Sequence, residues 1–376
     1  MSDGNMPMKD SMENNIPEFE SQHMPPELSH YFGQIPVWLD RAEDGDNIIL
    51  STRIRLARNL KSIPFPGRAK REQLRAVINR SKAALNRIQI CKEMTAFEKN
   101  ELLPLYKKAF VERRIISPVF SDNDQIGMVA IDPDEELAIM VNEEDHLRIQ
   151  AVQAGLSLQE AWRQISRLDD ELSEYMDFAF MPQFGYLTSC PTNTGTGMRA
   201  SILIHLPALS MADEIDATIK KLAPNEIAVR GFYGEGTDFV GNIYQISNQL
   251  TLGRTEASVV DRLEVVADKF SEMEQEARDR LLEQQREEIE DRVYRSLAIL
   301  KNARLLSSEE FMKYISMLML GVDLEILDEI SSLELKKLMI FTQPAHMQIM
   351  YQASSDLQSR DALRAQIVRQ KINSIA

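Results

Sequence analysis

The 376-residue sequence has few cysteines, no long apolar run and no excess of basic residues. Its two cysteines exclude a scaffold held by disulfides and fit a reducing compartment. No apolar stretch reaches the roughly 18 residues that a membrane-spanning helix needs. The polar, Met- and Glu-rich start also lacks the apolar centre of a signal peptide. We therefore expect a cytoplasmic protein without a membrane span.

The charge balance argues against polyanions as general partners. Lys and Arg number 43 against 58 Asp and Glu, which gives a formal net charge of −15. So acidic a surface repels nucleic acid and anionic membranes unless basic residues are concentrated in one place. Hydrophobic residues at 44% and charged residues at 27% are typical of an ordinary globular protein. The length suits two or three domains of about 150 residues.

Hydrophobic patterning divides the chain into three parts. Residues 1–34 have no apolar period and are predicted to be a disordered N-terminal extension. Between 35 and 261, short strand patterns mix with helical ones, which favours an α+β fold with an antiparallel sheet flanked by helices. From 262 to 376 only helical spacing recurs, which predicts a separate all-helical C-terminal domain.

The same patterns predict individual elements. Strands are expected at 126–131, 137–141, 200–206, 226–230 and 242–247, and a strand or loop at 52–60. Helices are expected at 69–90, 147–168 and 259–281. The apolar stripe of the last helix needs a partner face, so we expect a homodimer through the helical domain.

Arginines beside polar or glycine-rich loops are the strongest chemical signal. In segment 51–55, Ser-Thr-Arg-Ile-Arg, Arg53 and Arg55 alternate and point to one face of an extended chain. Guanidiniums facing one way suit a polyphosphate, because each binds two oxygens and keeps its charge. A strand with solvated arginines is the alternative interpretation. Segment 190–201 offers a loop with two glycines that can present backbone N–H groups to an anion, and Arg199 closes it.

Two further segments combine acids with arginine. Segment 141–148 places three consecutive acids after a predicted strand, where a cation or hydrogen-bond donor would relieve their repulsion. A helix N-terminus with acids stabilised by the helix dipole is the alternative. Segment 229–236 holds Arg230 and Glu235 on a glycine-flanked loop.

These four segments resemble the motifs of the phosphagen (guanidino) kinase family, in the family's order, over residues 47–255. They read Ser-Thr-Arg-Ile-Arg, Asn-Glu-Glu-Asp-His-Leu-Arg, Cys-Pro-Thr-Asn-Xaa-Gly-Thr and Arg-Gly-Xaa-Xaa-Gly-Glu. The resemblance implies a phosphagen-kinase fold and transfer of the γ-phosphoryl group of ATP to a guanidinium nitrogen. It also implies Mg²⁺, held by phosphate oxygens and water rather than by a protein metal site.

The resemblance implies a role for each site residue. Glu144 is the expected general base, Glu235 the second carboxylate that orients the guanidinium, and Glu143 the neighbour that competes for the first role. Cys190 stands at the family's reactive cysteine, whose thiolate would polarise the guanidinium. The expected nucleotide-binding residues are Ser51, Thr52, Arg53, Arg55, Arg114, Arg148, Arg199 and Arg230. Arg114 stands where the family has a histidine, which leaves its role open.

The layout resembles the bacterial protein arginine kinases within this family, which phosphorylate arginine side chains of proteins. The N-terminal helical domain of the small-molecule enzymes is not recognisable, and a helical C-terminal extension is present instead. Segment 360–365, Arg-Asp-Ala-Leu-Arg-Ala, resembles the element that binds phosphoarginine as an allosteric signal. The residues concerned are Arg360, Asp361, Arg364 and Ala365. Arg360 and Arg364 are four apart and share a helix face, and a solvated charged face is the alternative.

The expected function is therefore ATP-dependent phosphorylation of protein arginines, which marks proteins for stress response and degradation. A kinase for free arginine and a non-catalytic phosphoarginine-binding adaptor are the alternatives. The resemblance further implies a zinc-binding activator protein, a stress-response repressor and an AAA+ unfoldase as partners.

Overall fold

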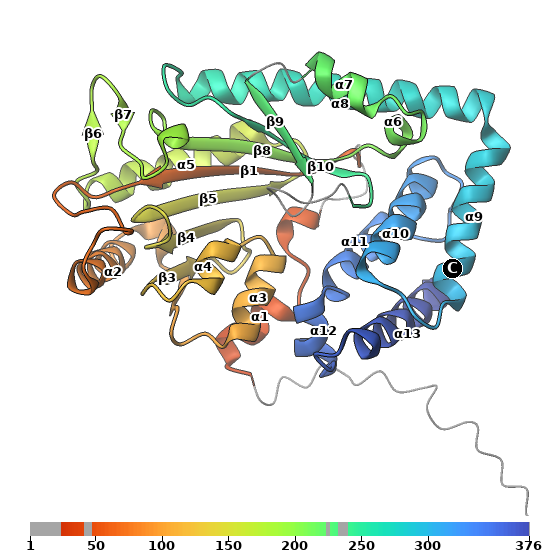
Figure 1. Cartoon of the computed structure of the whole chain (residues 1–376), viewed down its shortest axis with the longest axis horizontal. Coiled ribbons are helices and arrows are strands. Elements are labelled where there is room, and N and C mark those ends of the chain that lie inside the picture. The colour runs from red at the N-terminus through yellow and green to blue at the C-terminus, as the bar shows by residue number, and fades with distance from the viewer. Residues whose placement is uncertain (1–23, 41–46, 223–225, 232–239, 376) are drawn as a thin grey trace, which may run out of the picture.

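The computed structural model describes residues 24–40, 47–222, 226–231 and 240–375 (Figure 1). Two regions are visible along the chain: a sheet with flanking helices, and a group of helices to one side of it. Helix α8 (Glu256–Gln284) runs along the sheet and leads into that second group. No helix among the described residues is both long and apolar enough to cross a membrane.

An eight-stranded sheet forms the centre of the first region, and all its neighbouring strands are antiparallel. Its strand order is β2-β3-β4-β5-β1-β8-β10-β9. The strands are β1 (Ile49–Arg58), β2 (Thr95–Glu98), β3 (Met128–Ile131), β4 (Leu137–Val141), β5 (Leu147–Ala154), β8 (Met198–His205), β9 (Ile227–Gly231) and β10 (Ile243–Asn248). A separate hairpin pairs β6 (Phe180–Met181) with β7 (Gly185–Tyr186). The predicted α+β class with an antiparallel sheet is confirmed.

Helices cover the central strands of the sheet on one side, and a second group of helices packs on the other face of β3 and β4. Helix α5 (Leu158–Ser173) packs on β1 and β5, and α8 packs on β8 and β10. The inward side chains of the central strands, such as Ile54 and Ile202, are buried in the core that these helices share. The remaining helices of this region are α1 (Pro26–Phe32), α2 (Arg71–Leu85), α3 (Pro104–Glu112), α4 (Pro118–Asp122), α6 (Pro207–Met211) and α7 (Ile215–Leu222).

Helix α1 lies within the segment that we expected to be disordered up to residue 34. Leu28, Tyr31 and Phe32 on this helix are buried. The Tyr31 hydroxyl donates to the carbonyl oxygen of Ile131 at 3.1 Å, and the Phe32 ring lies 5.3 Å from that of Phe110. The expectation is wrong for the part after residue 23, because these side chains form a small core with α3. Residues 1–23 lie outside the described residues.

The segment 147–168, predicted to be one helix, is a strand followed by a helix. It forms β5 and the first two-thirds of α5, which Gly155 separates with a φ of 62°. Arg, Gln and Ala favour helices locally. In β5, however, they alternate with Leu147 and Ile149, and pairing with β4 and β1 on both sides decides the conformation.

The C-terminal region is helical throughout its described length, as predicted. It contains α9 (Arg286–Asn302), α10 (Ser308–Asp323), α11 (Ser332–Phe341), α12 (Pro344–Tyr351) and α13 (Leu357–Ile375). The expected domain limit between 261 and 262 falls inside the single helix α8. The apolar stripe of α8, including Leu263 and Phe270, is buried in the core of this same chain. The stripe therefore gives no argument for a dimer.

Candidate active site

Five arginines project from one face of the sheet. In the strand register, Arg55 of β1 lies opposite Arg199 of β8, and Ala57 of β1 lies opposite Arg148 of β5. Arg230 of β9 lies opposite Gln245 of β10. Opposite residues share a face and side chains alternate along a strand. The register therefore places Arg53, Arg55, Arg148, Arg199 and Arg230 on the face opposite the core helices.

Arg114 joins these residues from the loop after α3. Its Nη2 donates to Oε1 of Gln245 at 3.0 Å, and Nη2 of Arg53 donates to the same oxygen at 3.0 Å. The guanidinium of Arg114 also lies 5.6 Å from the ring centroid of Trp38. We call the six arginines the arginine face: Arg53, Arg55, Arg114, Arg148, Arg199 and Arg230.

The arginine face is electrostatically strained without an anion. Burial, followed by repulsion from the neighbouring arginines, holds the pKa of Arg53 and of Arg55 well below the usual value for a guanidinium. Burial also lowers the pKa of Arg114 to about 10. Within the described residues, the buried Nε atoms of Arg53 and Arg55 have no hydrogen-bond partner. A polyanion such as a triphosphate would supply both the charge and the acceptors.

The two hydroxyl residues expected beside these arginines, Ser51 and Thr52, lie in different surroundings from each other. Thr52 alternates to the other face of β1, where its Oγ1 donates to the carbonyl oxygen of Gly155 at 2.7 Å and accepts from the N–H of Ser157 at 3.0 Å. It fixes the β5–α5 connection and does not join the arginine face. Ser51 is buried near the start of β1.

The three consecutive acids form the turn between β4 and β5, which excludes the alternative of a helix N-terminus. Glu143 is buried and accepts from Nη1 of Arg148 at 2.8 and 2.9 Å and from the Ser117 hydroxyl at 2.5 Å. The side chain of Glu144 is exposed, and that of Asp145 is buried. Glu143 thus holds an arginine in place, while Glu144 faces the solvent.

The segment that carries Cys190 is fastened to this turn. The Ser189 N–H and the Asn59 side-chain amide donate to one oxygen of Asp145, at 2.7 and 2.6 Å. The Ser189 hydroxyl donates to the main-chain carbonyl of Glu144 at 2.7 Å. These bonds bring the partly buried Cys190, the next residue, beside Glu144. Glu235, the second expected carboxylate, lies outside the described residues.

Arg58 supports the far end of the Cys190 loop. Its buried guanidinium stacks 3.5 Å from the ring centroid of Tyr186 and donates to the carbonyl oxygen of Thr196 at 3.0 Å. Asp169 of α5 balances its charge at 2.7 Å. Gly197 has a φ of 65°, and a Cβ there would lie 2.6 Å from Nη1 of Arg58. The loop is therefore clamped where it enters β8.

Sequence reasoning missed several of these supporting residues. Gln245 accepts from Arg53 and Arg114, and Ser117 donates to Glu143. Asp145 and Asn59 fasten the segment before Cys190 to the β4–β5 turn. Asp145 stands inside a recognised motif, and the polar residues of β10 alternate at Gln245 and Ser247. That alternation was a readable signal for a polar sheet face.

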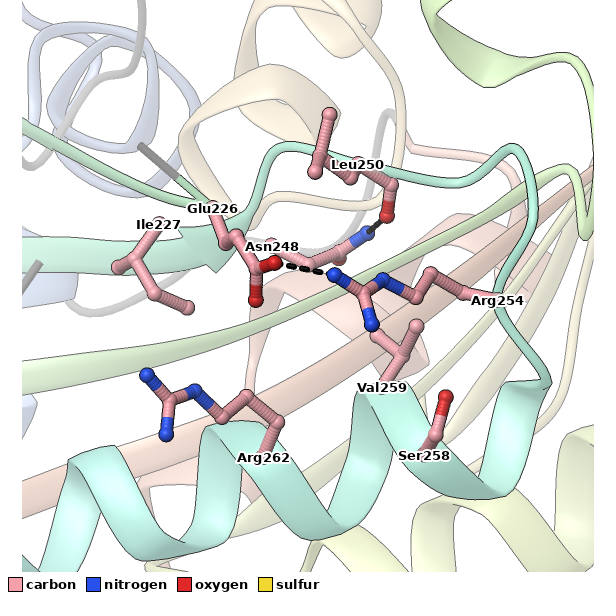
Figure 2. A pocket seen from close by; sticks show the side chains of 8 residues that line it. All are labelled: Glu226, Ile227, Asn248, Leu250, Arg254, Ser258, Val259 and Arg262. Carbon is pink, nitrogen blue, oxygen red and sulfur yellow. Dashed lines mark hydrogen bonds and ion pairs between the residues drawn. The ribbon is translucent and has the colours of Figure 1, made fainter. Parts of the chain in front are cut away.

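A pocket of about 310 Å³ lies between β9, β10 and the start of α8 (Figure 2). Arg254 forms an ion pair with Glu226 across it. Asn248 on its wall donates to the Leu250 carbonyl at 3.1 Å and accepts from the N–H of Ala200 at 2.8 Å. None of the predicted site residues that the structure describes lines it, and Asn248 serves to fix the start of β8.

The C-terminal motif is divided between interior and surface. The buried guanidinium of Arg364 donates to the carbonyl oxygens of Thr342 and Leu306, at 3.1 and 2.8 Å, and to Asp361 at 2.7 Å. Ala365 is buried, whereas Arg360 is only partly buried. The Nε of Arg360 is enclosed without a hydrogen-bond partner in the described part of the chain. Arg364 therefore ties α13 to its neighbours, and Arg360 lies nearer the surface.

A family model described as ATP:guanido phosphotransferase, C-terminal catalytic domain, matches residues 76–277, over half of the chain. The chain belongs to the ATP:guanido phosphotransferase family. A second model, the C-terminal domain of the protein-arginine kinase McsB, matches residues 286–376. Between the two matches lies the junction of α8 and α9. The predicted family is thus confirmed over both regions.

Curated relatives in this family match nearly the whole chain. The protein-arginine kinase of Caldanaerobacter subterraneus subsp. tengcongensis is 43% identical over 332 residues, which are 87% of this chain and 97% of that protein. The protein-arginine kinase of Bacillus subtilis is 40% identical over 349 residues, 92% of this chain and 96% of that protein.

Solved structures in the family show the same fold. A duplicated taurocyamine kinase from Schistosoma mansoni has a TM-score of 0.55 and 26% identity, over 66% of this chain and 38% of that chain. A lombricine kinase has a TM-score of 0.56 and 24% identity, over 66% of this chain and 71% of that chain, and shows the fold alone. The predicted phosphagen-kinase fold is confirmed.

Proposed function

We propose that this protein is a kinase that transfers the γ-phosphoryl group of ATP to arginine side chains of proteins. Relatives with that name match 87–92% of the chain at 40–43% identity. The single observation that supports this chemistry is that the β4–β5 turn contacts both the arginine face and the Cys190 segment. Its Glu143 holds Arg148 of the arginine face, and its Glu144 is joined to the Cys190 segment.

The arginine face is the proposed site for the triphosphate. Guanidiniums suit phosphate oxygens because each offers several donors in a plane. The charge of the transferring phosphoryl group spreads over its oxygens, so a wide cationic surface stabilises the transition state better than one cation. Mg²⁺, where bound with ATP, would neutralise part of the phosphate charge.

The acceptor side would activate a weak nucleophile. An arginine guanidinium has a pKa above about 12 and holds its proton at neutral pH. Glu144 is the proposed base that accepts N–H bonds and removes the proton as the N–P bond forms. Glu235 is proposed as the second carboxylate on motif similarity, and the Cys190 thiolate would favour and polarise the cationic guanidinium. No covalent bond to Cys190 is needed.

The surroundings of Cys190 favour a polypeptide as the acceptor. The β6–β7 hairpin precedes Cys190 and projects from the sheet (Figure 1). It exposes Phe180, Met181 and Phe184 by 54%, 42% and 47%. Tyr186 at its end exchanges two backbone hydrogen bonds with Gly195 of the Cys190 loop, at 2.8 and 3.3 Å. Apolar residues beside a target arginine can pack there, whereas free arginine has none to offer.

The C-terminal region is the proposed regulatory part. Arg360 and Asp361 on α13 are the candidates for binding phosphoarginine, with Arg364 and Ala365 supporting them from the interior. By family resemblance we further propose a zinc-binding activator protein, a stress-response repressor and an AAA+ unfoldase as partners. A homodimer, a cytoplasmic location and a role in marking proteins for degradation belong to the same proposal.

The function is tested by incubating the protein with Mg²⁺-ATP and one of two acceptors. The acceptors are an unfolded, arginine-rich protein and free arginine. We expect acid-labile phosphate on protein arginines, located by mass spectrometry under non-acidic handling. Phosphorylation of free arginine alone would show a small-molecule kinase instead. Binding of phosphoarginine without any ATP turnover would show an adaptor.

A further inference from the structure

The carboxylate of Glu112 joins helix α12 of the C-terminal region to helix α3 of the catalytic region. Glu112 is the last residue of α3, and it accepts from the N–H groups of Ala345 and His346, at 2.7 and 3.1 Å. It also lies 2.8 Å from Nδ1 of His346. Two free N–H groups at the start of α12 are thus satisfied from another region of the chain. His346 is fully buried, with its ring 5.9 Å from that of Phe32.

Arg113, the next residue, fixes the other side of His346. Its Nη1 lies 3.3 Å from Nε2 of His346, its Nε donates to Glu135 at 2.9 and 3.1 Å, and its Nη2 donates to the Gln34 carbonyl at 3.0 Å. A guanidinium can only donate, so Nε2 of His346 accepts and Nδ1–H donates to Glu112. The partners thus define one neutral tautomer. Burial also keeps the pKa of His346 low.

Arg114, the third residue of this run, belongs to the arginine face. Its φ of 64° is in the left-handed region, which a non-glycine residue occupies only when its surroundings hold it there. Its carbonyl oxygen accepts from the Gln150 side chain at 3.1 Å, and its guanidinium reaches Gln245. The residues that restrain it from the N-terminal side are Glu112 and Arg113, both bound to His346.

We propose that Glu112 and His346 are positioning residues for Arg114, so that α12 forms part of the support of the nucleotide site. The inference rests on the proposed nucleotide site. It predicts that weakening the contact between α3 and α12 disturbs ATP binding, although neither residue lies on the arginine face.

Glu112→Gln tests this, because the amide keeps the size of the side chain but points one donor at the N–H groups of α12. We expect the Kd for Mg²⁺-ATP to rise about tenfold with a smaller change in kcat. Arg114→Ala should raise the Kd similarly. The double variant should then bind ATP little worse than either single variant, because Glu112 affects nucleotide binding only through Arg114. His346→Gln provides an independent second variant if Glu112→Gln folds poorly.

Trp38 gives a readout that a general loss of stability does not move. The chain has two tryptophans, so a Trp162→Phe background isolates the emission of Trp38, which lies against Arg114. We expect Glu112→Gln to shift that emission at a temperature where the protein is folded. Glu310→Gln is the matched control, since Glu310 also accepts at a helix N-terminus of the C-terminal region but has no link to α3. It should leave both the Kd and the emission unchanged.

The outcomes separate the proposed nucleotide site from the proposed positioning role of Glu112 and His346. A wild-type Kd in Arg114→Ala would remove Arg114 from the nucleotide site. A raised Kd in Arg114→Ala, with wild-type Kd and Trp38 emission in both Glu112→Gln and His346→Gln, would overturn the positioning role alone. Neither result depends on which guanidino compound accepts the phosphoryl group.

Discussion

The hydroxyl of Ser189 donates to the main-chain carbonyl of Glu144 at 2.7 Å. This bond joins two motifs that lie more than forty residues apart in the sequence. It places the loop of Cys190 at the β4–β5 turn without using the Glu144 carboxylate. The Glu144 side chain is exposed at that turn.

Adjacent acids in that turn serve opposite sides of the site. Glu143 turns inward to Arg148 and Ser117, and Glu144 turns outward. Asp145 turns inward again and holds Ser189 and Asn59. Such alternation lets one turn support the phosphate site, carry the proposed base and anchor the cysteine loop.

Glu144→Gln and Glu143→Gln should therefore have different consequences. Glu144→Gln should lower kcat by about 10²–10⁴-fold, because the proposed base is lost, with ATP affinity and melting temperature close to wild type. Glu143→Gln should lower the free energy of unfolding by about 1–3 kcal/mol, because the partly buried Arg148 loses its charged partner. Rates with a protein substrate, ATP binding and thermal melting are the measurements. A steep rise in ATP Kd for Glu144→Gln would contradict its place on the acceptor side.

The sheet was largely predictable from its local patterns. Strands β3, β4, β8, β9 and β10 lie within two residues of their predicted limits, because runs of apolar residues end at turn residues. Helix α1 was missed although Leu28, Tyr31 and Phe32 have helical spacing, because the polar residues before them dominated the composition. Strand β5 was mistaken for helix because its helix-forming residues are overruled by its neighbours in the sheet.

Local patterns indicated that arginines share one face of the sheet, but they did not indicate how the strands bring those arginines together. Alternation alone showed that Arg53 and Arg55 share a face. That Arg199 lies opposite Arg55 depends on the pairing of β1 with β8, which no local pattern specifies. The same alternation argued against Thr52, which was included because it stands next to Arg53 in the motif. The contact between Glu112 and His346 joins residues 234 positions apart and left no local signal.

Arg55→Gln should stabilise the protein in the absence of nucleotide. The pKa of Arg55 is lowered by burial and then by neighbouring arginines, so its charge opposes folding at every pH below its folded-state pKa. Removing the charge should raise the melting temperature by about 2–4 °C. The additional stabilisation by saturating Mg²⁺-ATP should become smaller, because one phosphate ligand is lost.

Differential scanning calorimetry with and without Mg²⁺-ATP measures both effects. Arg163→Gln is the matched control, since Arg163 is an exposed arginine on α5 paired with Glu160. It should change neither value. An unchanged melting temperature and an undiminished ATP shift in Arg55→Gln would show that the arginine face is neither strained nor used for phosphate.

Asp132 should make the protein less stable as the pH rises. Burial raises the pKa of Asp132 to about 7, and its Oδ1 is enclosed without a partner in the described residues. An acid with a raised folded-state pKa binds its proton more tightly when folded, so stability falls between about pH 4 and pH 7 and is level above that. Asp132→Asn should remove this fall and stabilise the protein at pH 8 by about 1–3 kcal/mol. Urea unfolding at pH 5 and pH 8 tests this, with the exposed Asp134→Asn in the same turn as control. Equal pH slopes in the wild type and Asp132→Asn would refute the assignment.

Arg360 and Arg364 should respond differently to removal, although they share a motif. Arg364→Ala leaves the carbonyl oxygens of Leu306 and Thr342 and the Asp361 carboxylate without their donor, and should destabilise the protein by about 3–5 kcal/mol.

Arg360→Ala should leave the melting temperature close to wild type, because its side chain lies nearer the surface and its Nε holds no bond in the described chain. It should nevertheless abolish binding of phosphoarginine, because a guanidinium is the side chain best suited to that phosphate. Calorimetric titration with phosphoarginine and thermal melting of both variants separate the two roles. Full phosphoarginine affinity in Arg360→Ala would place that ligand elsewhere, whereas a large loss of stability in the same variant would make Arg360 a structural residue like Arg364.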